Sequence, residues 1–307
     1  MEKTEYIWLD GEFVKWDSAK VHILTHTLHY GLGVFEGIRV YKCSENLSSV
    51  FCLDWHVKRF FESAKIVGLK IPFKPSDIEK AILETVKKNG VRSGYIRPIA
   101  IIGDGEMGLY AYDNPVHVAI AVWPWGTYLG EEGLKKGIRV KISSFVRHHI
   151  NASMTKAKVC GYYVNSILAK KEAKELGFDE AVLLDSDGFV AEGAGENIFI
   201  VKDGVVKTPA PHSILPGITR KVVMLFLKEF GIDCKEERFT RDELYTSDEA
   251  FLTGTAAEIT PIREVDGRAI GNGEFKIVRK IQDKFFKVTT GKDEKYMHLL
   301  SFVDFSK

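Results

Sequence analysis

Four Asp-Gly pairs are spread along the sequence and constrain its fold more than any other feature. They are Asp10-Gly11, Asp187-Gly188, Asp203-Gly204 and Asp266-Gly267. An Asp-Gly pair between two apolar runs favours a tight β-hairpin, because both residues tolerate the positive φ that such a turn requires. We therefore expect a hairpin over residues 5–16, and hairpins or turns at the other three pairs.

Amphipathic helices are expected between these turns. Apolar residues at i, i+3, i+4 and i+7 predict a helix over 54–68 with Asp54 as its N-cap. A second helix is expected to begin at Ser76, which has capping-box spacing to Glu79, and to end at Asn89-Gly90. Further helices are expected at about 161–176, 218–230 and 273–289, and strands at 95–103, 115–123, 138–146, 180–185, 197–202 and 249–254. This mixture, without strict βαβ alternation, predicts the α+β class.

The length of 307 residues suggests two domains. Proline and glycine crowd into residues 124–137, and such a stretch is typical of an interdomain linker. We therefore expect a smaller α+β domain over 1–123 and a larger one over 138–307.

Composition limits the partners and the location of the chain. Lysine and arginine number 43 against 42 aspartates and glutamates, a balance of +1 that argues against a nucleic-acid partner. The strongest apolar stretch, 116–125, is interrupted by His117 and Pro124, so no membrane span is expected. The N-terminus has no secretory signal pattern, which favours the cytoplasm. The four cysteines are widely spaced and are expected to be free thiols.

Four local motifs in the second half indicate chemistry when they are taken together. Lys158 precedes small or apolar residues, and loss of hydration there would free its amine for a Schiff base. Glu192 begins a run of small residues up to Asn197, where a partly buried carboxylate needs a cationic partner. Residues 215–220 precede a helix whose N-terminus favours anions, and 253–258 combine small residues with hydroxyls. Each motif alone also fits a solvated lysine, a glycine turn or a helix cap, but together they suit a phosphorylated aldehyde cofactor.

With these residues in place, the sequence resembles the fold-type IV pyridoxal-phosphate aminotransferases, and most closely the branched-chain amino-acid aminotransferases. The resemblance extends from the first hairpin to about residue 290. It rests on His29-Tyr30-Gly31, Phe35-Glu36-Gly37-Ile38-Arg39, Lys58-Arg59-Phe60, Gly94-Tyr95-Ile96-Arg97-Pro98, Met107-Gly108-Leu109, Pro124-Trp125-Gly126, Lys158 with Gly161 and Tyr163, Glu192 to Asn197, Leu215 to Arg220, and Gly254 to Glu258.

The resemblance implies a role for each cofactor residue. Lys158 is implied as the catalytic residue, which would form the Schiff base with pyridoxal 5'-phosphate and then move the proton between Cα and C4′. Glu192 would keep the pyridine nitrogen protonated, and Tyr163 would donate to the phenolic oxygen. The phosphate would be held by Arg59, Ile218, Thr219 and Thr255, with the Arg59 guanidinium offering two parallel donors. The cofactor would lie in the cleft between the two domains.

The same resemblance implies the substrate site and the partner. Tyr95 and the amides around Thr255 and Ala256 would hold the α-carboxylate, while Arg97 with Tyr30 and Tyr128 would receive the distal carboxylate of glutamate. The apolar pocket for a branched side chain would be lined by Phe35, Gly37, Tyr30 and Tyr128. Tyr30 and Met107-Gly108-Leu109 would come from the other subunit, so a homodimer, or a larger assembly of dimers, is implied.

The function expected from the resemblance is exchange of the amino group of L-leucine, L-isoleucine or L-valine with 2-oxoglutarate in a ping-pong reaction. The alternatives are a D-amino-acid or broad amine transaminase of the same fold, an aminodeoxychorismate-type lyase, and a cofactor-free binding protein. No metal site is expected, because adjacent residues such as His148 and His149 point to opposite faces of an extended strand.

Overall fold

The computed structural model describes residues 2–126 and 128–306. Its contacts divide the chain into two compact units. Unit 1 comprises residues 2–126, 157–162 and 287–306, and unit 2 comprises 128–156 and 163–286. This division departs from the expected boundaries of 1–123 and 138–307. The segment around Lys158 and the C-terminal tail group with the N-terminal unit, because their backbone hydrogen bonds are made there.

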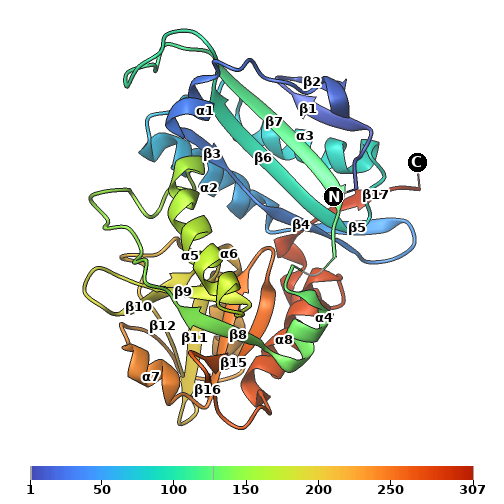
Figure 1. The fold of residues 1–307 in the computed structure, drawn as a ribbon. Coiled ribbons are helices and arrows are strands. Elements are labelled where there is room, and N and C mark those ends of the chain that lie inside the picture. The colour runs from blue at the N-terminus through green and yellow to red at the C-terminus, as the bar shows by residue number, and fades with distance from the viewer. Residues whose placement is uncertain (1, 127, 307) are drawn as a thin grey trace. The chain divides into compact units, whose positions relative to one another are not determined.

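Unit 1 contains an antiparallel sheet. Its strands are β1 (Tyr6–Leu9), β2 (Glu12–Lys15), β3 (Gly33–Phe35), β4 (Ile38–Lys42), β5 (Leu47–Phe51), β6 (Gly94–Ile102), β7 (Val116–Pro124) and β17 (Leu300–Asp304). Their order is β17-β5-β4-β6-β7-β1-β2, and β3 also pairs with β6 (Figure 1). The predicted first hairpin is confirmed: Leu9 lies opposite Glu12, and Asp10 and Gly11 both adopt positive φ, 49° and 102°.

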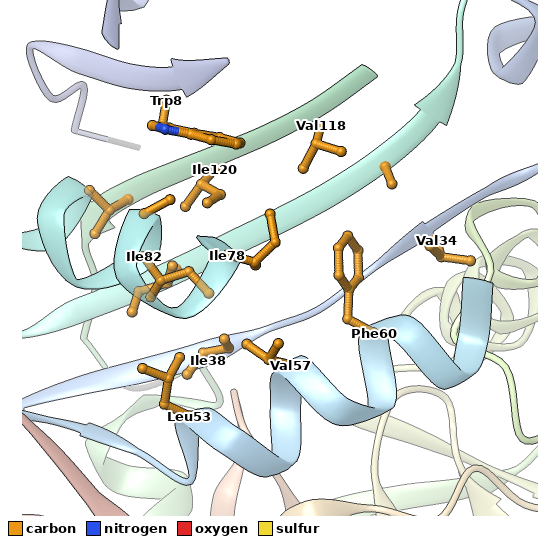
Figure 2. Close-up of a cluster of buried hydrophobic side chains, with 14 of the residues drawn as sticks. Trp8, Val34, Ile38, Leu53, Val57, Phe60, Ile78, Ile82, Val118 and Ile120 are labelled. Atoms are coloured by element: carbon orange, nitrogen blue, oxygen red, sulfur yellow. The ribbon is translucent and has the colours of Figure 1, made fainter. Parts of the chain in front are cut away.

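Unit 1 also contains helices, and the two longest bury their apolar faces against this sheet. The helices of unit 1 are α1 (His26–Tyr30), α2 (Leu53–Ile66), α3 (Pro75–Lys88) and the 3-10 turns η1 (Trp16–Ser18), η2 (Cys160–Tyr162) and η3 (Glu294–Leu299). Figure 2 shows Val57 and Phe60 of α2 and Ile78 and Ile82 of α3 directed at side chains of the strands, such as Ile120. Each such side chain contributes roughly 1.5–3 kcal/mol on full burial.

Both predicted N-caps in this unit are wrong by two residues. Helix α2 begins at Leu53 after Cys52, which has a left-handed φ of 51°, so Asp54 lies in the first turn instead. In α3 the cap is Lys74, whose backbone N–H donates to Asp77, because Pro75 takes the first helical position. The predicted end of this helix at Asn89 and Gly90 is confirmed.

Unit 2 contains a second, mixed sheet. Its strands are β8 (Ile138–Ile142), β9 (Glu180–Leu184), β10 (Val190–Gly193), β11 (Asn197–Lys202), β12 (Val205–Thr208), β13 (Cys234–Glu236), β14 (Glu249–Gly254), β15 (Glu258–Val265) and β16 (Arg268–Ala269). Their order is β10-β9-β8-β15-β14-β11-β12-β13, with β16 paired to β15. Strand β8 runs parallel to β9 and β15, and β12 runs parallel to β13. The turns predicted at Asp187, Asp203 and Asp266 each connect an antiparallel pair, as expected.

Three of the helices of unit 2, at 163–175, 218–229 and 276–289, fall close to the predicted ranges, whereas those at 130–136 and 241–245 were not predicted. The helices are α4 (Gly130–Lys136), α5 (Tyr163–Glu175), α6 (Ile218–Glu229), α7 (Arg241–Tyr245) and α8 (Lys276–Thr289), whose last three residues group with unit 1. Helix α5 packs Ala169 and Ala173 against Ala181 and Leu183 of β9. The stretch predicted as a linker, 124–137, contains the seven-residue helix α4, in which Gly130 is the first residue, Gly133 lies in the interior and Gly137 is the C-cap.

Two expectations about the whole chain can be compared with the described residues. The four cysteines are free thiols, as predicted. Over residues 2–126 and 128–306, no helix is both long and apolar enough to cross a membrane.

Candidate active site

Lys158 is fixed in unit 1 through its backbone. Its N–H donates to the Ser63 hydroxyl at 3.0 Å, its carbonyl accepts from the Phe35 N–H at 3.1 Å, and the next residue, Val159, bridges to Val34. The side-chain Nζ lies 4.9 Å from the centre of the Phe35 ring. The lysine is therefore held at the end of β3, with its amine against an aromatic face.

Two glycines allow the segment after Lys158 to approach α1. The Gly161 N–H donates to the Gly31 carbonyl at 3.0 Å, and a Cβ on Gly31 would lie 2.9 Å from the Gly161 Cα. Gly31 also has a φ of +75°. Between the lysine and this contact, burial raises the pKa of the Cys160 thiol to about 11, so the thiol stays protonated at neutral pH.

Arg59 lies on α2 and is paired with a buried carboxylate. Its Nε and Nη2 donate to the two oxygens of Glu36 at 2.6 and 2.9 Å. This edge of the guanidinium therefore holds Glu36, and the binding of a phosphate by Arg59 stays a prediction. A phosphate would have to use the other edge.

Glu36 also accepts a hydrogen bond from His56 Nδ1 at 2.7 Å. Burial, the largest single effect, would raise the pKa of Glu36, but the Arg59 charge, the interaction with His56 and the hydrogen bonds from both side chains together outweigh it and hold the pKa well below its usual range. Burial lowers the pKa of His56, so the ring is a neutral donor at pH 7. Neither Glu36 nor His56 was assigned a role from the sequence. The signal in the sequence for such a role is the acidic residue itself, which lies between Phe35 and Gly37 in an otherwise apolar strand region.

Tyr95, Arg97, Phe35 and Gly37 come together in unit 1. Tyr95 and Arg97 share one face of β6, since they are two residues apart, and the Arg97 guanidinium lies 4.8 Å from the Phe35 ring and 5.3 Å from the Tyr95 ring. The Nε of Arg97 is buried and has no hydrogen-bond partner among the described residues. These four predicted substrate residues therefore form one cluster of contacts, which reaches the Lys158 amine through the Phe35 ring.

Gly37 is required by its contact with Tyr95. A Cβ at this position would lie 1.8 Å from the Tyr95 hydroxyl oxygen. We expect Gly37→Ala to displace this ring and to lower the free energy of unfolding by about 1–3 kcal/mol, as overpacking does. Urea unfolding would measure the change. Gly126→Ala is the control, because a Cβ there meets nothing within 4 Å, and an equal loss in both variants would contradict the assignment.

Tyr30 ends α1 and is the most exposed of the predicted pocket residues in unit 1, at 45%. Its ring stacks on that of His26, with the centroids 4.5 Å apart. His26 Nε2 donates to the carbonyl of Gly108 at 2.7 Å, which connects α1 to the Met107-Gly108-Leu109 segment. The His29-Tyr30-Gly31 and Met107-Gly108-Leu109 segments, which both contribute to the family resemblance, are thus adjacent in unit 1.

In unit 2, Glu192 is held at the end of β10 by several donors. Arg147 Nε donates to Oε1 at 2.5 Å, Asn197 Nδ2 donates to Oε2 at 3.1 Å, and the Leu215 N–H lies 3.2 Å from Oε2. The sequence predicted that the Glu192 carboxylate needs a cationic partner but did not identify it. In the structure this partner is Arg147. Arg147 lies directly before the His148-His149 pair in the sequence. These donors fix the direction of the Glu192 carboxylate.

The predicted phosphate residues of unit 2 lie at the start of α6 and after β14. Ile218 and Thr219 form the first turn of α6, where backbone N–H groups and the helix dipole favour an anion. Asn197 connects this turn to Glu192, because its Nδ2 also donates to the Leu215 carbonyl at 2.9 Å. Thr255 and Ala256 lie in the turn between β14 and β15, and strand β14 pairs with β11, which begins at Asn197.

Tyr163 and Tyr128 are the remaining predicted residues. Tyr163 is the half-buried first residue of α5. Tyr128 is exposed, and the Lys170 ammonium lies 5.5 Å from its ring centre. The roles proposed for these tyrosines stay predictions.

Glu196, a buried acid in the Glu192–Asn197 motif, has an abnormal pKa. Burial, reinforced by the nearby Glu180 charge, raises the pKa of Glu196 to about 8. Since this exceeds the ordinary value of 4.5, the protonated side chain stabilises the fold fully below pH 4.5, and this stabilisation is lost as the pH rises through 8.

We therefore expect Glu196→Gln to flatten the dependence of stability on pH between about 5 and 8. The wild-type free energy of unfolding should fall more steeply than that of the variant, by up to about 1.4 kcal/mol per pH unit. Urea unfolding at pH 5.5, 6.5 and 7.5 measures both slopes. Glu175→Gln, on the exposed end of α5, should leave the slope unchanged, and parallel curves for wild type and Glu196→Gln would refute the pKa.

Comparison with known proteins gives one family. A family model described as amino-transferase class IV matches residues 33–265. A branched-chain-amino-acid aminotransferase of Pseudomonas aeruginosa is 52% identical over 94% of this chain and 94% of its own length.

Solved structures agree with this result. The crystal structure of the Escherichia coli branched-chain amino acid aminotransferase has a TM-score of 0.95 and 43% identity, covering 97% of this chain and 99% of that one. The T.th. branched-chain amino acid aminotransferase complexed with N-(5'-phosphopyridoxyl)-L-glutamate has a TM-score of 0.93 and 44% identity, covering 98% and 99%.

Proposed function

Because the chain belongs to the class IV aminotransferases, and within them to the branched-chain amino-acid aminotransferases, we propose that it exchanges the amino group of L-leucine, L-isoleucine or L-valine with 2-oxoglutarate. Pyridoxal 5'-phosphate is the carrier, and the reverse direction makes the branched-chain amino acids. The observation that carries the proposal is the 52% identity over nearly the whole chain, together with the position of Lys158 against Phe35.

The residues present fit this cofactor. The chain offers an amine in Lys158, a guanidinium in Arg59 and the N-terminal turn of a twelve-residue helix for the phosphate, and a fixed carboxylate in Glu192 for the pyridine nitrogen. The Thr253 Oγ1, beside the predicted phosphate turn, is buried without a hydrogen-bond partner among the described residues, which suits a polar ligand nearby.

The residues of this chain divide the chemistry among them. When bound, the cofactor supplies an aldehyde that takes up the amino group and a ring that accepts the electrons released at Cα. Lys158 would take the proton from the substrate Cα and pass it to C4′ within the same half-reaction, acting as general base and then as general acid, and it would move a proton in the opposite direction in the second half-reaction. Glu192 keeps a proton on the pyridine nitrogen, and Arg147 and Asn197 fix the direction of that carboxylate.

The substrate residues account for both amino acids. Tyr95 and the amides at Thr255 and Ala256 hold the α-carboxylate. Arg97, whose buried Nε has no partner among the described residues, takes the distal carboxylate of glutamate. The T.th. relative is complexed with a phosphopyridoxyl-glutamate adduct, which supports glutamate as one of the two amino acids. The branched side chain packs on Phe35 beside Gly37.

We propose a homodimer, or a larger assembly of dimers, as the working unit. Apolar side chains crowd the exposed surface of α1 and the adjacent 103–114 loop, among them Leu28, Leu109, which is 90% exposed, and Tyr110. Such concentrations mark protein interfaces. Tyr30 and the Met107 segment belong to this surface, which supports their delivery to a neighbouring subunit. Four free thiols suit a reducing compartment, which supports a cytoplasmic location.

A panel of half-reactions tests the function. The yellow holoenzyme should lose its visible absorbance with L-leucine, L-isoleucine or L-valine and regain it with 2-oxoglutarate. Faster reaction with D-alanine than with L-leucine would instead indicate a D-amino-acid transaminase. Release of pyruvate without an amino acceptor would indicate a lyase of the aminodeoxychorismate type.

A further inference from the structure

We propose that Glu36 is a positioning residue for the cofactor's phosphate: together with His56 it fixes the Arg59 guanidinium, so that affinity for the phosphate group depends on Glu36. The inference rests on the proposed function, because the phosphate is that of pyridoxal 5'-phosphate. The residues involved all belong to unit 1.

The geometry of the pair restricts where Arg59 can point. A guanidinium is planar and carries its five N–H donors in a rigid fork. Its Nε and one Nη2 donor are directed at the two oxygens of Glu36, at 2.6 and 2.9 Å. With two donors of one edge assigned, the plane and the direction of the remaining donors are set.

Glu36 is itself held from several sides. Its side chain is fully buried and accepts from His56 Nδ1 at 2.7 Å and from the Gly37 N–H at 3.2 Å. Its backbone N–H donates to the Pro98 carbonyl at 2.9 Å, so the main chain is anchored to β6 as well. Because several donors hold the Glu36 carboxylate in place, the carboxylate sets the position of the Arg59 guanidinium rather than the reverse.

The pair also makes the site ready before the ligand arrives. Glu36 compensates the buried Arg59 charge without the phosphate, so the guanidinium does not have to reorganise on binding. Preorganised groups raise affinity because less ordering accompanies binding. A buried ion pair that only joins α2 to the strands would stabilise the fold without favouring a phosphorylated ligand, and this difference can be measured.

The test compares two ligands that differ by the phosphate. Apoenzyme of wild type and Glu36→Gln is titrated with pyridoxal 5'-phosphate and with pyridoxal, and binding is followed by absorbance. Partners that orient a binding group typically change affinity by about 10- to 100-fold, so Glu36→Gln should weaken pyridoxal 5'-phosphate by about 10-fold or more and leave pyridoxal within about 2-fold. The ratio of the two affinities does not depend on the fraction of protein that is folded.

Glu62→Gln, on the exposed face of the same helix, is the matched control and should change neither affinity. If Glu36→Gln does not fold, Glu36→Asp retains the charge but withdraws it by one methylene, and the same loss for the phosphorylated ligand is expected. Equal weakening of both ligands, or of neither, would overturn the inference while leaving the proposed function intact. A wild-type protein that binds neither ligand would overturn both.

Discussion

Lys158→Ala is expected to lower the rate of the L-leucine half-reaction on the order of 10³-fold, the largest effect expected of any single substitution. The variant loses the group that moves the proton at Cα, while the backbone bonds of residue 158 to Ser63 and Phe35 remain possible. Single-turnover absorbance measures the rate. Borohydride reduction followed by mass spectrometry measures covalent attachment, which should disappear.

The control for this prediction lies two residues earlier. Lys156 is exposed, and Lys156→Ala should retain the wild-type rate and the reducible attachment. Thermal unfolding of the Lys158→Ala apoenzyme should match wild type, since the amine is only half-buried. A reducible chromophore that survives in Lys158→Ala would assign the attachment to another lysine.

Glu192→Gln is expected to have the second-largest effect, lowering the half-reaction rate on the order of 10²-fold. The amide cannot keep a proton on the pyridine nitrogen, so the ring becomes a weaker electron acceptor. Arg147 also loses its anionic partner in a buried position, which should lower the free energy of unfolding by about 3–5 kcal/mol. Stopped-flow absorbance at saturating L-leucine and urea unfolding measure the two effects.

Asp187→Asn gives the matched control, because Asp187 lies in the turn before β10 and its ion pair with Arg238 is exposed. Exposed pairs contribute about 1 kcal/mol or less, so rate and stability should stay near wild type. If the Glu192→Gln enzyme turned over as fast as the control, the assignment of Glu192 to the cofactor site would be contradicted.

The sequence predicted the elements that depend on local signals. All four predicted turns are confirmed, and three of them, at Asp10, Asp203 and Asp266, are two-residue turns in which both residues adopt the positive φ that their side chains allow. Asp187-Gly188 lies in a longer connection between β9 and β10. The helices around Val57 and Phe226 also agree with prediction, since a long apolar period specifies a helix face without reference to the rest of the fold.

What could not be predicted depends on residues far apart in the chain. Strand β17 has no motif, and it is a strand because Val303 and its neighbours pair with β5, about 250 residues earlier. The same holds for the site: Glu36 meets Arg59 across 23 residues and Arg147 meets Glu192 across 45. A charged residue in a sequence shows that it needs a partner, but the fold selects which one.

The division of the chain into units has a consequence for biosynthesis. Unit 1 is assembled from three separate stretches, of which the last includes β17, the edge strand of its sheet. A chain emerging from the ribosome therefore presents β5 unpaired on that side until β17 has been made, whereas all of unit 2 has by then been synthesised. The first unit to begin is thus completed after the second, and deletion of β17 would leave this edge open to pairing with other chains.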